Sequence, residues 1–119
     1  MSNNVEGIEI PKGLTREGRK AAHTIVKLLK ERGMTNTGGC RTFYTPQEWR
    51  DRGERYGRDA LLVVVYDGGE VGPFFDLGAC YRTGAASDYE PYEAMRQRLT
   101  SVGVWSECAT HWYSAVYAL

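Results

Sequence analysis

The longest run of aliphatic and β-branched residues in the chain covers residues 60–66. Apolar residues follow one another there with little alternation, which is typical of a strand covered on both faces. Residues 67–69, Asp-Gly-Gly, come directly after it, and Asp-Gly is a strong signal for a tight β-hairpin. We therefore predict an interior strand over 60–66 and a hairpin in which residues 70–75 return beside it, with a bulge or a free edge at Pro73.

Apolar residues recur with a period near 3.6 over residues 15–32, which predicts a long helix. Thr15 suits the N-cap of this helix, and Gly33 suits the left-handed position just beyond its end. Residues 1–13 show no such period and contain glycine and proline. We therefore expect a flexible N-terminal arm over 1–13, followed by a single α+β domain over 14–119.

Two further helices are indicated by different signals. Thr45 and Glu48 form a capping box with proline at the first helical position, which predicts a second helix continuing to Tyr56. A stripe of apolar residues at three- and four-residue spacing predicts a third helix over 89–102.

The remaining strand signals lie over residues 40–44 and 104–119, and a turn or bulge near 109–110 would divide the second segment into a hairpin. Together these elements predict an α+β fold: a four- to five-stranded antiparallel or mixed sheet with about three helices packed on it.

Composition narrows the class of protein. A chain of 119 residues with 42% hydrophobic and 25% charged residues is typical of one globular domain. The longest apolar runs are far shorter than a membrane span, so we expect a cytoplasmic protein that does not enter the membrane. The formal net charge is zero. Many nucleic-acid binders are strongly basic and DNA mimics are strongly acidic, so the chain has the overall charge of neither class.

The three cysteines suggest one alternative. Cys108 and His111 have the spacing of a metal-ligand pair, and Cys40 and Cys80 could complete a tetrahedral zinc site. A cysteine-based enzyme centred on Cys108 and His111 is a variant of this hypothesis, and His23 is a second imidazole that could serve it. An odd, low cysteine count also suits buried thiols in a reducing compartment, and no complete catalytic motif is present.

A second alternative is a nucleic-acid binder. The predicted first helix carries several lysine and arginine residues outside its apolar face, and such side chains can contact phosphates.

The aromatic residues favour a third function, binding to another protein. Eight tyrosines and three tryptophans exceed what the core of a small sheet needs. Tyrosine, tryptophan and arginine are enriched in protein–protein interfaces, because they combine a large apolar surface with a polar group. We therefore predict a non-enzymatic protein-binding module, a monomer or homodimer, whose partner-binding residues are Trp49, Arg50, Arg52, Tyr56, Trp112 and Tyr113.

Three blocks of the sequence carry a resemblance: Thr42-Phe-Tyr-Thr-Pro-Gln-Glu-Trp-Arg-Asp-Arg-Gly53, Leu62-Val-Val-Val-Tyr-Asp-Gly-Gly69 and Trp112-Tyr-Ser-Ala-Val-Tyr117. They resemble small phage and mobile-element proteins of uncharacterised function. The resemblance implies an accessory role, and proteins of this kind include inhibitors of bacterial defence, anti-CRISPR proteins among them. Such inhibitors usually act by occupying a surface of a CRISPR-Cas effector, so the implied partner is a bacterial immunity complex in the host cytoplasm.

Overall fold

The computed structural model describes residues 8–34, 38, 41–67, 69–82 and 89–119. Along the chain the elements are α1 (Arg16–Glu31), β1 (Phe43–Tyr44), α2 (Pro46–Asp51), β2 (Leu62–Val65), the 3-10 helix η1 (Gly72–Phe74), α3 (Leu77–Arg82), α4 (Glu90–Ser101), β3 (Val104–Thr110) and β4 (Tyr113–Ala118). The strands form one antiparallel sheet in the order β1-β2-β4-β3, which confirms the predicted α+β class.

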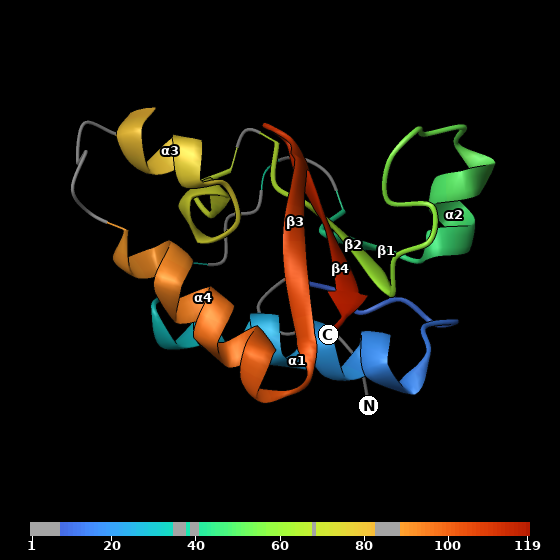
Figure 1. Cartoon of the computed structure of the whole chain (residues 1–119), viewed down its shortest axis with the longest axis horizontal. Coiled ribbons are helices and arrows are strands. Elements are labelled where there is room, and N and C mark those ends of the chain that lie inside the picture. Colours follow the sequence, from blue (N-terminus) through green and yellow to red (C-terminus); the bar gives the residue numbers. More distant parts are fainter. Residues whose placement is uncertain (1–7, 35–37, 39–40, 68, 83–88) are drawn as a thin grey trace.

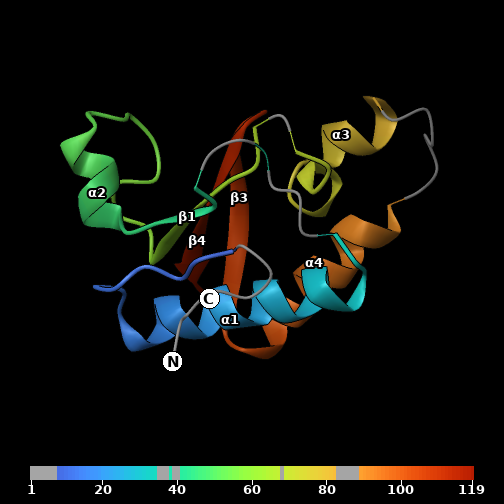
Figure 2. The same ribbon diagram turned by 180° about the vertical axis from the view of Figure 1, so that it is seen from behind.

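The predicted interior strand is confirmed. β2 pairs with β1 on one side and with β4 on the other, and all four of its residues are buried. Leu62 and Val64 belong to the apolar layer that includes α1 and α4, whereas Val63 and Val65 belong to a second layer on the other face, against α2. Figures 1 and 2 show α1 and α4 side by side across one side of the sheet, with α2 beyond β1. A strand covered on both faces needs no alternation of polar and apolar residues.

The predicted hairpin partner of this strand is wrong. The backbone does turn after β2, where the amide of Gly69 donates to the carbonyl of Tyr66 at 3.2 Å. Residues 72–74 then form η1, and α3 follows it, so the chain leaves the sheet. Two physical reasons are visible: Pro73 cannot donate a ladder hydrogen bond, and Phe75 stacks on Tyr66 with ring centroids 5.4 Å apart. The place beside β2 is taken by β4, which pairs along the whole strand.

The predicted first and third helices are confirmed as α1 and α4. The hydroxyl of Thr15 accepts from the amide of Gly18 at 3.0 Å, and Gly33 has a φ of 67° beyond the end of α1. The capping box of α2 is also confirmed, but α2 ends at Asp51 rather than at Tyr56. Gly53, with a φ of 78°, is the reason, because this left-handed residue redirects the backbone just beyond the sixth helical residue.

The C-terminal segment forms the predicted hairpin. β3 and β4 pair along their length, with a shift in register between Cys108 and Thr110 close to the predicted bulge. At the other end of the chain, Ile8 and Ile10 are buried in the layer that holds α1. Among the described residues, no helix is long and apolar enough to cross a bilayer.

Gly18 provides a test of how closely α1 packs on the sheet. A Cβ atom at this position would lie 2.5 Å from the carbonyl oxygen of Leu61, which belongs to the backbone leading into β2. Helix propensity alone would make Gly18→Ala stabilising by about 0.5–1 kcal/mol. We expect the clash to dominate and to lower the free energy of unfolding by about 1–3 kcal/mol in a urea titration.

Lys20→Ala, on the exposed side of the same helix, is the control and should change stability by no more than about 0.5 kcal/mol. A Gly18→Ala protein that is as stable as the wild type would show that α1 does not approach Leu61 so closely.

Candidate protein-binding surface

An aromatic cluster fills the space between α2 and the sheet. Trp49 projects from α2 and is fully buried, and its ring centroid lies 4.9 Å from that of Tyr113 on β4. Tyr44 on β1 and Trp112 at the β3–β4 turn complete the cluster, at 5.2 and 5.9 Å from Trp49. Because α2 has only six residues, these ring contacts are what attach it to the sheet. The indole N–H of Trp49 has no hydrogen-bond partner among the described residues, so contacts of the ring itself hold the side chain in place.

Two arginine side chains lie against the cluster. The guanidinium carbon of Arg41 is 4.2 Å from the centre of the Tyr44 ring, and that of Arg52 is 4.7 Å from the Trp49 ring. Both distances are within the range of cation–π attraction. Arg41 also donates to the carboxylate of Glu48 and to the carbonyl of Phe43, which fixes its orientation. Arg52 is the freer of the two, since the ion pair that it makes among the described residues, to Glu54, is long at 3.3 Å.

A small hollow of about 230 Å³ opens beside this cluster. It is lined by Tyr44, Arg52, Val65, Asp67 and Trp112. Its floor is therefore apolar and aromatic, and its rim carries one cation and one carboxylate. Such a hollow fits a single side chain of a binding partner.

A larger groove of about 430 Å³ lies between the segment after α2 and the β3–β4 half of the sheet. It is lined by Arg50, Arg55, Tyr56, Gly57, Arg58, Asp59, Glu107 and Tyr117. Arg55 and Arg58 make no ion pair among the described residues, and Arg50 donates only to the Arg58 carbonyl and to Gln47. Tyr56 is 54% exposed at the groove, although its backbone carbonyl accepts from the Tyr113 hydroxyl.

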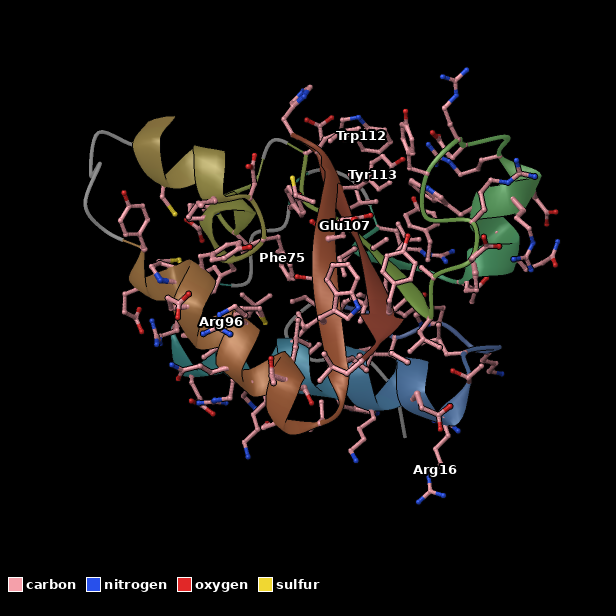
Figure 3. The ribbon with its side chains drawn as sticks, viewed as in Figure 1. Arg16, Phe75, Arg96, Glu107, Trp112 and Tyr113 are labelled. Atoms are coloured by element: carbon pink, nitrogen blue, oxygen red, sulfur yellow. The ribbon has the colours of Figure 1, made fainter. Side chains whose placement is uncertain are left out.

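The hollow, the groove and the Arg41 side chain that stacks on Tyr44 together define what we call the arginine–aromatic surface. Its exposed and half-buried members are Arg41, Tyr44, Arg50, Arg52, Arg55, Tyr56, Arg58, Trp112 and Tyr117. On the neighbouring strand, Trp105 is 39% exposed and packs on Tyr117 with centroids 5.5 Å apart, so aromatic side chains continue onto β3. Figure 3 shows Trp112 and Tyr113 at the turn and Glu107 on β3.

The structure corrects two of the predicted partner-binding residues. Trp49 and Tyr113 are 0% and 2% exposed, so the expectation that their rings lie at the surface is wrong. They support the surface from beneath, because α2 needs large side chains to anchor it. Arg50, Arg52 and Tyr56 are exposed, and Trp112 is half-buried.

Several members of the surface were not predicted from the sequence: Arg41, Tyr44, Arg55, Arg58 and Tyr117. A signal existed for Arg55 and Arg58, because Arg55 precedes Tyr56 directly and Arg58 follows it by two residues, in a short segment rich in charged residues and glycine. For Arg41 no signal in the sequence was available, since its position over Tyr44 depends on the path of the chain into β1.

The three predicted metal ligands that the structure describes, Cys80, Cys108 and His111, form no metal-binding group. Cys40 lies outside the described residues. Cys80 is buried in α3, and its thiol donates to the carbonyl of Pro73. Cys108 and His111 lie at the β3–β4 turn, and the described part of the chain contains no group of three His, Cys, Asp or Glu side chains placed to hold a metal ion.

Cys108 instead belongs to a polar network. Its thiol lies 3.8 Å from the hydroxyl of Tyr66, which in turn lies 2.9 Å from the hydroxyl of Ser114. Burial raises the pKa of the Cys108 thiol, and it raises the pKa of Tyr66 as well. A raised pKa keeps the thiol protonated at neutral pH, which is the reverse of what a cysteine nucleophile needs.

Comparison of the chain with known protein families, curated proteins and solved structures gives no match.

The Arg41–Glu48 pair generates a prediction about pH. Hydrogen bonds from Arg41 and from the Thr45 amide hold the pKa of Glu48 below its usual value. A carboxylate with a lower pKa in the folded than in the unfolded state stabilises the fold above the unfolded pKa of about 4.3, and this stabilisation is lost as the pH falls through the folded pKa.

We therefore expect Glu48→Gln to lower the free energy of unfolding by roughly 1 kcal/mol at neutral pH, a modest value because the pair is partly exposed. The difference from the wild type should shrink towards zero below about pH 4 in urea titrations. Asp51→Asn removes the same charge from the same helix and should have a smaller effect. A Glu48→Gln effect that does not depend on pH would contradict this role for the carboxylate.

Proposed function

We propose that this protein is a non-enzymatic protein-binding module that uses the arginine–aromatic surface to hold an acidic face of a partner protein. The observation that carries the proposal is the groove in which Arg55 and Arg58, which make no ion pair with any described residue, flank the exposed ring of Tyr56.

The residue types favour a protein as the ligand. Tyrosine, tryptophan and arginine account for a large share of binding energy in protein interfaces, and they do so where each side chain is already held in place. Tyr44 is held by Trp49 and Arg41, and Trp112 is held by Trp49 and Tyr113. Little side-chain freedom would therefore be lost when a partner covers them.

The charge of the groove favours an acidic partner. Arg50, Arg55 and Arg58 face the same groove as Asp59 and Glu107, and within the part of the chain that the structure describes none of the three arginines makes an ion pair. Guanidinium groups bind carboxylates through two parallel hydrogen bonds, so an exposed Asp or Glu of the partner would fit between them.

The sequence resemblance to phage and mobile-element proteins supports a bacterial immunity complex, a CRISPR-Cas effector in particular, as the first class of partner to test. A surface of exposed rings and guanidinium groups suits an inhibitor that acts by covering a functional face of such a complex.

The test is direct binding of the purified chain to purified CRISPR-Cas effectors, together with an interference assay in cells. The variant Tyr56→Ala/Arg58→Ala removes one ring and one cation from the groove. Two interface anchors of this kind should weaken the dissociation constant by about 30-fold or more and abolish the inhibition.

The matched control, Tyr92→Ala/Arg96→Ala, removes the same two residue types from α4, on the opposite side of the sheet. It should bind as the wild type does. The proposal fails if no effector is bound and if no protein recovered from a bacterial lysate, once purified, distinguishes the groove variant from the α4 control.

A further inference from the structure

Helix α1 presents an uninterrupted band of basic side chains to solvent. At about 100° per residue, Arg16, Arg19, Lys20, Lys27 and Lys30 fall within one arc of about 100° around the helix. All five are exposed, and His23 lies within the same arc. We call these five residues the basic stripe. Figure 3 shows Arg16 extending from the ribbon away from the rest of the molecule.

Within the described residues the charge of the stripe is offset at one point, where Lys27 attracts the carboxylate of Glu31 four residues along the helix. None of the five residues makes an ion pair in the described part of the chain. The carboxylate at the end of α1, Glu31, is occupied by Arg98 of α4 at 2.7 Å. Arg32, just beyond the helix, is likewise paired with Glu90 at 2.6 Å. The pairs that join α1 to α4 therefore leave the outer face of α1 positively charged.

The make-up of the stripe indicates which class of ligand it suits. A protein-binding surface has an apolar or aromatic centre, as the arginine–aromatic surface does. The stripe contains only basic side chains and His23, with no aromatic or large apolar residue among them. Binding to a phosphate backbone needs only such cations, because it is driven by charge neutralisation and counterion release.

A membrane surface is the less suitable anionic ligand. Amphipathic helices bind bilayers by inserting their apolar face. The apolar face of α1, which includes Ala22, Ile25 and Leu29, is fully buried against the sheet and α4. It cannot insert into lipid while the domain is folded.

We propose that the basic stripe of α1 binds the phosphate backbone of a nucleic acid. At a rise of about 1.5 Å per residue the stripe is about 21 Å long, which matches about six successive phosphates of one strand at 3.4 Å each along a duplex axis. The helix is held rigidly on the sheet, so its cations are arranged before binding. The contacts reach phosphates only, so binding does not depend on base sequence.

The stripe and the arginine–aromatic surface lie on opposite sides of the sheet. α1 packs on the face that carries Leu62 and Val64, whereas the aromatic cluster packs on the face that carries Val63 and Val65. A protein partner and a nucleic acid could therefore be held at the same time. The inference rests on the charge of α1 and not on the proposed protein-binding function.

The experiment titrates the full chain into fluorescently labelled DNA duplex and single-stranded RNA, each about 20 nucleotides long, and follows anisotropy at about 50 and 200 mM salt. We expect micromolar binding at the lower salt. Neutralising four to five phosphates gives a slope of about −4 for log affinity against log salt, so the higher salt should weaken binding by about two orders of magnitude. Comparison of the two probes identifies which nucleic acid supplies the backbone.

Two matched variants locate the site. Arg16→Gln/Lys20→Gln/Lys27→Gln should weaken binding at about 50 mM salt by more than tenfold and make the salt slope shallower by about 2–3. Arg50→Gln/Arg55→Gln/Arg58→Gln removes three charges from the other side of the sheet and should stay within about threefold of the wild type. Circular dichroism checks that both fold.

Three results would overturn the proposal: no binding of either probe at the lower salt, an equal loss in both triple variants, or displacement of the probes by polyglutamate at lower charge concentrations than by unlabelled DNA. The last result would identify an acidic protein as the ligand of α1. Failure of the protein-binding function would be seen separately, because it is tested with Tyr56 and Arg58, which lie outside the stripe.

Discussion

Burial of β2 on both faces is the constraint on which the rest of this structure depends. Its four residues alternate between two apolar layers, so the strand must be covered by α1 and α4 on one side and by the α2 segment on the other. Neither covering layer is stable without the strand between them, because each buries its apolar side chains against the sheet. The two outer surfaces that carry the functional proposals are therefore fixed relative to each other by a single strand.

The two coverings are built differently, and this difference explains their surfaces. α1 has 16 residues with small and aliphatic side chains facing inward, so its outer side is free to be wholly polar. α2 has six residues and cannot bury enough area with aliphatic side chains alone. It depends on Trp49 and on rings from β1 and β4, and the outermost of these rings reach the surface together with the arginines that stack on them. The outer surface on the α1 side of the sheet is thus basic, whereas the outer surface on the α2 side carries both aromatic and basic side chains.

Much of the fold could be predicted from local signals. The caps at Thr15 and Thr45, the stripe of α4 and the interior character of β2 depend on residues close together in the sequence, and the structure confirms each of them. The turn after β2 formed as predicted, but the strand predicted to return beside β2 did not. That place is taken by β4, which lies nearly 50 residues further along the chain. Local turn chemistry cannot predict which of two segments takes the place beside a strand.

For the candidate sites too, some features follow from the sequence alone and others depend on the tertiary structure. The sequence by itself determined that α1 is basic outside its apolar face and that aromatic residues are in excess, since both follow from composition and helical period. Only the tertiary structure decided that Trp49 and Tyr113 are buried supports, that Arg41 and Arg52 lie on aromatic rings, and that Cys108 joins Tyr66 and Ser114. The physical reason is that exposure and side-chain contact depend on how distant segments pack, whereas charge and periodicity are properties of each segment alone.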